Sequence, residues 1–289
     1  MQRRGYLRGL AGGGVAAGLA GCLGVLGGGA GRHTYLPKSA MAKKVDSAAL
    51  PYPAWGQPLP TVTLPDPLTG DPVTTTGFEG ERNVLLTCFY SHCPEPSPHN
   101  SAICREMVGV MRNIQADGEA HGYGDKLAFL AITFDPARDT AARLRTYAGQ
   151  EHIDLHAGNW YFMRPRDAQQ AEAVVDGDFG VKFIRTTATP ATTGTATTTT
   201  GSATTGSTAA GPATPPAAAT DAKTPTSTSS PATPDVSTAA GTYTYQHAAM
   251  LFLANLDGYV ERAYVFESRG NPPWQDRRDD VKRLIAKEG

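Results

Sequence analysis

A long tract of small and polar residues divides the part of the chain that can fold. Between Thr186 and Ala240 nearly every residue is Thr, Ala, Ser, Pro or Gly, and apolar residues show no periodic spacing. Such a segment cannot bury enough surface to offset the entropy that it would lose on ordering. We therefore expect residues 186–240 to be a disordered insertion, so any folded core must be assembled from the segments on either side of it.

The first residues have the features of an export signal. Arg3 and Arg4 precede an apolar run of Gly, Ala and Leu that ends in Leu-Ala-Gly-Cys22. The paired arginines resemble a twin-arginine signal, and the last four residues resemble a lipobox, whose cysteine becomes the lipidated first residue of the mature protein. A transmembrane helix is the alternative, but the run is rich in Gly and shorter than the ~20 residues that a span needs. Residues 1–22 are thus predicted to be a signal peptide, and lipidation of Cys22 would anchor the protein to the outer face of the cytoplasmic membrane.

Composition limits the remaining function classes. Residues 23–58 are rich in Gly, Ala, Lys and Pro without periodicity, which predicts a flexible tether. The formal net charge is -1 and charges of both signs are interspersed, so no nucleic-acid partner is expected. The four cysteines are too few for a disulfide scaffold, and lipidation of Cys22 would leave an odd number. At least one remaining thiol should therefore stay free, bind metal or pair transiently.

Two apolar runs, at residues 83–91 and 126–134, are typical of central strands covered on both faces. Each is followed by helical spacing, over 101–115 and from Asp139 or Thr140 to Tyr147. Further short strands are predicted at 60–64, 73–76, 159–163, 243–256 and 259–266, and helices at 167–175 and from 272 or 273 to 285. Two βαβ-type halves, a terminal hairpin and a final helix predict an α/β, thioredoxin-like fold over residues 59–289, interrupted by the insertion before the last hairpin.

The end of the first central strand carries a recognisable motif. Leu85 to Pro98 reads Leu-Leu-Thr-Cys-Phe-Tyr-Ser-His-Cys-Pro-Glu-Pro-Ser-Pro, which resembles the Sco/SenC segment that ends in Cys-x-x-x-Cys-Pro, with Cys93 at the first cysteine position. The similarity continues through Asp135-Pro-Ala-Arg-Asp139-Thr140 and through His247, which an apolar strand and Asp-Gly follow. It covers the chain from Leu59 to the C-terminus, apart from the insertion.

This resemblance implies a function. Sco/SenC proteins are thioredoxin-like, hold copper through two cysteines and a later histidine, and serve assembly of the copper centre of cytochrome oxidase or the thiol reduction that prepares it. Cys93 and His247 would be the matching copper ligands here. The partners implied are a cytochrome oxidase subunit or another copper client, together with the membrane through the lipid anchor.

The second cysteine of the motif is replaced by Ser97. Cu(I) prefers thiolate, thioether and imidazole donors, so a hydroxyl is a poor substitute and the site is degenerate. The redox dithiol of the motif is lost as well. Among substitute donors we favour His99 over His92 and Met250, because it follows the turn at Pro98.

Two other cysteines look less suited to the site. Cys88 lies on the strand that precedes Cys93 and points to its opposite face, which indicates a small core residue. Cys104 shares a helix face with Ser97 but lies ~10 Å further along if that helix is regular, so direct ligation is not expected.

Asp135 and Asp139 stand at a strand-to-helix junction, where turn and cap chemistry explains them.

Three functions compete on this pattern. The favoured one is a metallochaperone of copper rather than an enzyme. The second is a single-cysteine thiol oxidoreductase or peroxidase, in which a helix N-terminus lowers the pKa of Cys93. A disulfide between Cys93 and Cys104 would favour this function. Against it, Leu86 and Tyr90 stand where the usual peroxiredoxin motif has Pro and Thr. The third is a tethered, non-catalytic binding module whose site has decayed.

Overall fold

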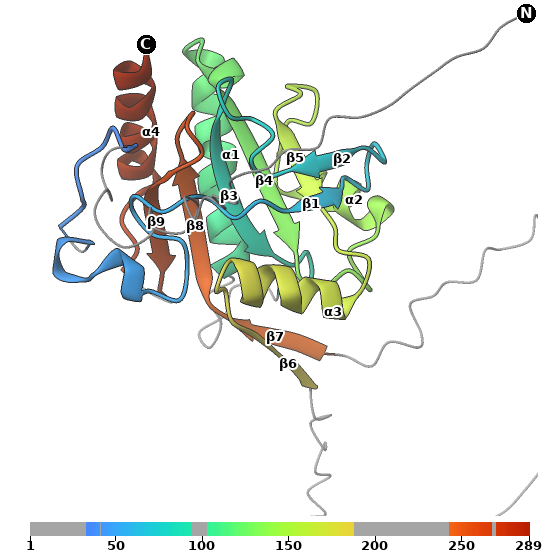
Figure 1. The fold of residues 1–289 in the computed structure, drawn as a ribbon. Coiled ribbons are helices and arrows are strands. Elements are labelled where there is room, and N and C mark those ends of the chain that lie inside the picture. The colour runs from blue at the N-terminus through green and yellow to red at the C-terminus, as the bar shows by residue number, and fades with distance from the viewer. Residues whose placement is uncertain (1–32, 41, 94–102, 188–242, 268–269) are drawn as a thin grey trace, which may run out of the picture. The chain divides into compact units, whose positions relative to one another are not determined.

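The computed structural model describes residues 33–40, 42–93, 103–187, 243–267 and 270–289 (Figure 1). Cys22, Ser97 and His99 lie outside the described residues, as does the predicted insertion beyond its first two residues. The chain divides into two compact units, one formed by residues 1–184 and 247–289 and the other by residues 185–246. None of the described helices combines the length and apolar character needed to cross a bilayer.

A five-stranded mixed sheet forms the centre of the larger unit, in the order β5-β4-β3-β8-β9. The neighbours β3, β4 and β5 are parallel, whereas β8 is antiparallel to both β3 and β9. Every residue of β3 and β4 is buried, as the two apolar runs predicted. The strands are β3 (Asn83–Phe89), β4 (Leu127–Thr133), β5 (Trp160–Met163), β8 (Ala249–Ala254) and β9 (Val260–Phe266).

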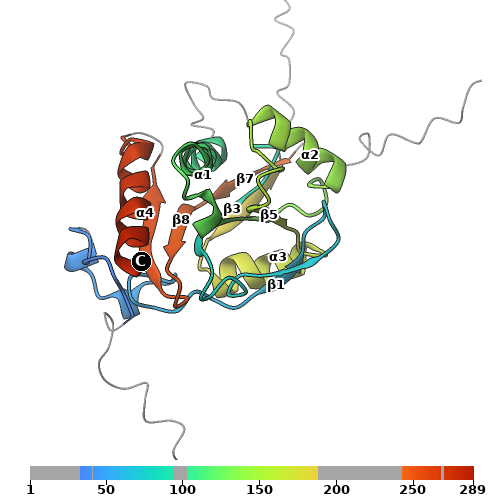
Figure 2. The same cartoon turned by 90° about the horizontal axis from the view of Figure 1, so that it is seen from above.

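Helices cover both faces of this sheet. Figure 2 shows α1 and α4 on one side and α3 on the other. The helices are α1 (Ile103–Ala120), α2 (Ala141–Gln150), α3 (Ala168–Ala171), which continues as a π-helix (Glu172–Asp178), and α4 (Trp274–Glu288). The unit β3-α1-β4, followed on the far side of β3 by the hairpin β8-β9 and by α4, is a thioredoxin-like arrangement, which confirms the predicted fold.

The remaining elements are short. Near the N-terminus a short antiparallel pair precedes β3, and two further short strands pair with each other rather than with the main sheet. These elements are β1 (Thr63–Pro65), β2 (Pro72–Thr74), β6 (Phe183–Thr187), β7 (Tyr243–His247) and the 3-10 turns η1 (Ala42–Lys44), η2 (Ser47–Ala49) and η3 (Gly124–Lys126). The single strand predicted over 243–256 is therefore two strands. They separate at Ala248, whose N–H donates to the carbonyl of Lys182 at 2.8 Å.

Residues 33–58 correct the prediction of a flexible tether. Glu261 on β9 is fully buried, and its carboxylate accepts the backbone N–H groups of Tyr35 at 2.7 Å and Leu36 at 2.9 Å. The indole N–H of Trp55 donates to the carbonyl of Leu36 at 2.9 Å. Burial of a carboxylate costs free energy unless hydrogen-bond donors satisfy it. The hydrogen bonds to Glu261 therefore stabilise the packing of Tyr35 and Leu36 against β9. The partners are far apart in the sequence, which is why composition alone did not reveal the contact.

The buried β3 strand gives a direct test of the core. Leu86 is fully buried in β3, whereas Val265 on β9 is 52% exposed. Leu86→Ala should lower the free energy of unfolding by about 2–5 kcal/mol, because it removes buried methyl groups and leaves a cavity. Val265→Ala should change it by about 0.5 kcal/mol or less. Urea unfolding of both variants measures this, and equal effects would contradict the assignment of β3 to the core.

Candidate metal centre

Three side chains with soft donor atoms meet where β3 ends and β8 begins. Cys93 follows β3, Cys104 lies in the first turn of α1, and His247 is the last residue of β7, two positions before β8 begins. The Sγ of Cys104 lies 3.1 Å from Nε2 of His247, and the Cys93 side chain hydrogen-bonds both residues. Because β3 and β8 are antiparallel neighbours, the pairing brings together residues that the insertion separates in the sequence. The structure thus places the predicted pair Cys93 and His247 side by side.

Cys104 is the residue that sequence reasoning missed. The estimate of ~10 Å assumed one regular helix from Ser97 onward, but α1 begins at Ile103, so Cys104 belongs to its first turn. It is fully buried on the same helix face as Met107 and Met111. The first turn of a helix that follows a strand lies near the end of that strand, and this positional signal could have identified Cys104 beside Cys93.

The imidazole of His247 is oriented for donation to a metal. Its Nδ1 lies 2.9 Å from the carbonyl oxygen of Ala248, which can only accept, so Nδ1 carries the proton. In the neutral ring Nε2 then keeps its lone pair, and Nε2 is the atom that faces Cys104. The rings of Tyr90 and Phe134 lie 5.9 Å and 5.1 Å from the imidazole centroid. A backbone acceptor for the other ring nitrogen is a usual way in which a ligand histidine is oriented.

The two thiols differ in acidity. A hydrogen bond from the Cys104 side chain lowers the pKa of Cys93 to about 5, and the interactions of Cys93 with His247 and with the backbone N–H of Cys104 contribute despite the opposing effect of burial. Burial raises the pKa of Cys104, and its hydrogen bond to Cys93 raises it further. Cys93 is therefore the thiolate of the pair, and Cys104 is a protonated donor to it.

A buried carboxylate anchors the loop that carries Cys93. Asp139 is fully buried, and it accepts hydrogen bonds from the backbone N–H of Ser91 at 3.2 Å and from the hydroxyls of Ser91 and Thr133. Nε of Arg143 donates to the Ser91 hydroxyl at 2.9 Å. The N-cap of α2 is Thr140, one of the two residues that the sequence allowed, and the N–H of Asp139 donates to the carbonyl of Asp135 at 2.9 Å, as expected of a turn residue. Asp139 holds in place the residue two positions before Cys93.

The other predicted donors that the structure describes do not join the cluster. His92 turns its Nδ1 toward Asp139, at 3.5 Å from Oδ1. Cys88 is buried in β3, where burial raises the pKa of its thiol, so it is the core residue that was predicted. Met250 is buried within β8. Asp135 pairs with Arg138.

Cys93, Cys104 and His247 carry donor atoms of the types that bind a soft metal ion. In this structure hydrogen bonds hold the three side chains together. Among the residues that the structure describes, no three His, Cys, Asp or Glu side chains already stand in metal-binding geometry. Sulfur and nitrogen ligands of one tetrahedral ion, at the bond lengths known for zinc, lie roughly 3.5 Å apart. The 3.1 Å separation of Cys104 and His247 is only slightly shorter. Thiolate and imidazole together select Cu(I) or Zn(II).

A hollow of about 420 Å³ opens beside Cys93. Arg105 in this hollow pairs with Glu151 at 2.7 Å, and Arg143 is held by Ser91. The lining residues are Ser91, His92, Cys93, Arg105, Arg143, Tyr147, Gln150 and Glu151. The hollow gives another molecule access to the Cys93 sulfur, whereas Cys104 is fully buried.

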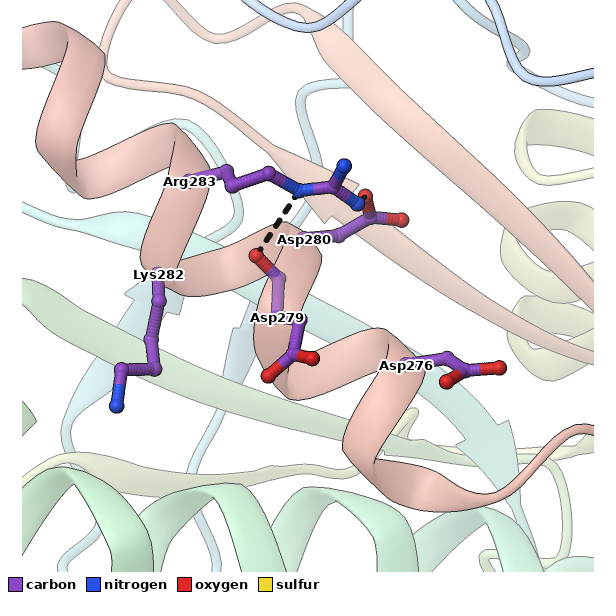
Figure 3. Close-up of a pocket in the computed structure, with 5 residues that line it drawn as sticks. All are labelled: Asp276, Asp279, Asp280, Lys282 and Arg283. Carbon is purple, nitrogen blue, oxygen red and sulfur yellow. Dashed lines mark hydrogen bonds and ion pairs between the residues drawn. The ribbon is translucent and has the colours of Figure 1, made fainter.

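A larger hollow of about 660 Å³ lies along α4 and has a different character (Figure 3). Its lining residues are Asp276, Asp279, Asp280, Lys282 and Arg283. Asp280 is paired with Arg283 and, at 3.0 Å, with Arg262. These charges neutralise one another on the helix surface, and the lining holds no cysteine or histidine, so we assign no chemistry to it.

The difference between the thiols predicts selective alkylation. Iodoacetamide at neutral pH should modify Cys93 first, because this thiol is partly exposed and largely ionised, whereas Cys88 and Cys104 are buried with raised pKa values. Peptide mass mapping of the reduced protein identifies each modified cysteine separately. Equal labelling of Cys104 and Cys93 would contradict the assignment of Cys93 as the thiolate.

The anchoring role of Asp139 predicts a loss of stability. Asp139→Asn exchanges one acceptor oxygen for an NH2 group that faces the donors of Ser91 and Thr133. The free energy of unfolding should fall by about 1–3 kcal/mol, the range for an unsatisfied buried polar group. Asp125→Asn, at an exposed position, is the matched control and should be neutral. Denaturant unfolding compares the two, and a neutral Asp139→Asn would show that the network is not needed.

Comparison with known proteins agrees with this site. The family model described as SCO1/SenC matches residues 67–203, a range that includes Cys93 and Cys104 and ends before His247. A search of curated proteins finds no match.

Several solved structures resemble the chain. Bradyrhizobium japonicum ScoI with copper bound is 18% identical, with 78% of this chain and 97% of that chain covered and a TM-score of 0.46. Yeast Sco1 is 16% identical, with 79% and 98% covered and a TM-score of 0.48. A SCO1/SenC family lipoprotein from Bacillus anthracis is 14% identical, with 82% and 96% covered and a TM-score of 0.47. At these values the fold assignment rests on the strand order described above. The family match shows that residues 67–203 are similar to the SCO1/SenC family, and this stretch holds the strands β3 and β4 of the thioredoxin-like sheet.

Proposed function

We propose that this protein is a membrane-tethered, extracytoplasmic copper-binding protein that assists assembly of the copper centre of cytochrome oxidase. The observation that carries the proposal is the meeting of the Cys93 thiolate with the His247 imidazole at the end of β3. Both are donors that Cu(I) prefers. Support also comes from relatives: ScoI of B. japonicum, ScoI of Arabidopsis thaliana and yeast Sco1 have structures with copper bound, and BsSco is described as a member of the Sco family of cytochrome c oxidase assembly proteins.

The site has the properties that a delivery protein needs. Copper is the cargo here, so it must be held firmly and yet be released to a client. His247 is fixed by Ala248 and by two aromatic rings, and it provides the stable side of the site. Cys93 borders the open hollow, so a client thiolate or imidazole can approach the metal there and replace one donor at a time. Such stepwise ligand exchange avoids release of free copper.

The proposed location rests on the first residues of the sequence. The twin-arginine-like motif and the lipobox-like Leu-Ala-Gly-Cys22 support export and a lipid anchor on the outer face of the cytoplasmic membrane. The similarity to a B. anthracis SCO1/SenC family lipoprotein is consistent with such an anchor. Anchoring would hold the domain beside a membrane oxidase. Replacement of the second motif cysteine by Ser97 leaves Cys93 and His247 as the motif ligands of a degenerate site.

A second candidate function is thiol-disulfide exchange, favoured by the contact between the Cys93 thiolate and the Cys104 thiol. Cys93 would attack a client disulfide, forming a mixed disulfide and releasing one client thiolate, which takes the Cys104 proton. Cys104, now a thiolate, would then attack the Cys93 sulfur and release the second client sulfur as a thiolate, which takes a proton from solvent. The client gains two electrons, the protein is left with a Cys93–Cys104 disulfide, and an external dithiol must reduce it.

Anaerobic titration with Cu(I) against a competing chelator tests the first proposal. The full chain should bind one equivalent. Cys93→Ala and His247→Ala should each weaken binding by more than about 100-fold, since loss of a second-shell partner alone costs about 10–100-fold. Cys88→Ala is the matched control and should bind like the parent.

If the parent chain binds copper no better than the Cys93 and His247 variants, copper handling is wrong for this protein. Thiol exchange at Cys93 and Cys104 would then be the better account. Circular dichroism of each variant confirms that a loss of binding is not a loss of fold.

A further inference from the structure

The proposed copper site lacks a second thiolate. Its two motif ligands, Cys93 and His247, provide one sulfur and one nitrogen, and the second motif position is Ser97. We propose that Cys104, from the first turn of α1, supplies the missing sulfur, so that copper is held by Cys93, Cys104 and His247. This inference rests on the proposed function and concerns a residue outside the Cys-x-x-x-Cys motif.

Position is the first argument. The Sγ of Cys104 lies 3.1 Å from Nε2 of His247, and the same side chain hydrogen-bonds Cys93. The Cys104 sulfur thus contacts both of the other donors, and an ion between Cys93 and His247 would lie within its reach. If the three side chains move slightly apart, bonds to the metal can replace the hydrogen bonds between them, and the backbone need not move.

Charge is the second argument. When Cu(I) binds, Cys104 loses its proton to solvent and forms a sulfur-metal bond, so two thiolates and Cu(I) carry a net charge of about -1. Cys104 lies at the N-terminal end of α1, an 18-residue helix whose dipole favours negative charge there. Its own backbone N–H already points to the Cys93 sulfur. The guanidinium groups of Arg105 and Arg143 line the hollow on the other side of Cys93.

Rigidity is the third argument. Cys104 is fully buried, in the same helix as the buried Met107 and Met111. Its sulfur is therefore held in place before the metal arrives, and little side-chain entropy is lost on binding. Cys88, the other buried cysteine among the described residues, lies within β3 and is not part of the cluster. It serves as the control for loss of a buried thiol.

Cu(I) competition titrations of the full chain test the proposal. Cys104→Ala should lower the affinity by about 10-fold or more, which corresponds to 1.4 kcal/mol or more, whereas Cys88→Ala should leave it unchanged. The double variant Ser97→Cys with Cys104→Ala restores a thiolate at the motif position and should regain the affinity of the parent chain.

The outcomes separate this inference from the proposed function. If Cys93→Ala and His247→Ala abolish binding but Cys104→Ala does not weaken it, Cys104 is not a ligand and the copper function stands. If no variant changes the affinity, both are wrong. Loss of affinity in Cys104→Ala without recovery in the double variant, while both stay folded, shows a packing effect and overturns the inference.

Discussion

The antiparallel pairing of β3 with β8 is the constraint on which the site depends. It joins a strand that precedes the Thr/Ala/Pro-rich tract to one that follows it, with Val84 opposite Ala254 and Thr87 opposite Leu251. This register places the start of β8, and therefore His247, beside the end of β3. The contact of 3.1 Å between His247 and Cys104 follows from that pairing. A shift of the register by one residue would turn the side chains of β8 to the other face of the sheet and would move His247 away from the end of β3.

The polar network around Asp139 completes the site from the opposite side. Asp139 and Arg143 both bind Ser91, and they fix the backbone that leads to Cys93. Two of the three donors, Cys104 and His247, thus lie in a helix and a strand, whereas Cys93 lies in the loop after β3 and borders a hollow. This division between two held donors and one accessible donor matches the needs of a protein that binds a metal ion and then passes it on.

The sequence predicted the parts of this structure that depend on local patterns. The fully apolar runs gave β3 and β4 with nearly correct ends, and similarity to the Sco/SenC motif identified Cys93 and His247, which the structure brings together. What could not be predicted depends on contacts between distant residues. Cys104 was set aside because its distance was measured from Ser97 along a regular helix, whereas the structure places it beside His247, and the packing of residues 33–58 was missed because it depends on the buried Glu261. Ser97, His99 and Cys22 lie outside the described residues, so their roles stay predictions.

X-ray absorption at the copper edge is the most direct test of the central claim, which is that Cys93, Cys104 and His247 share one Cu(I) ion. The full chain, reduced and loaded with one equivalent of copper without oxygen, should show two sulfur donors and one imidazole nitrogen. Cys104→Ala should retain the nitrogen and lose one sulfur. A single sulfur in the parent chain, or an unchanged sulfur count in Cys104→Ala, would contradict the account.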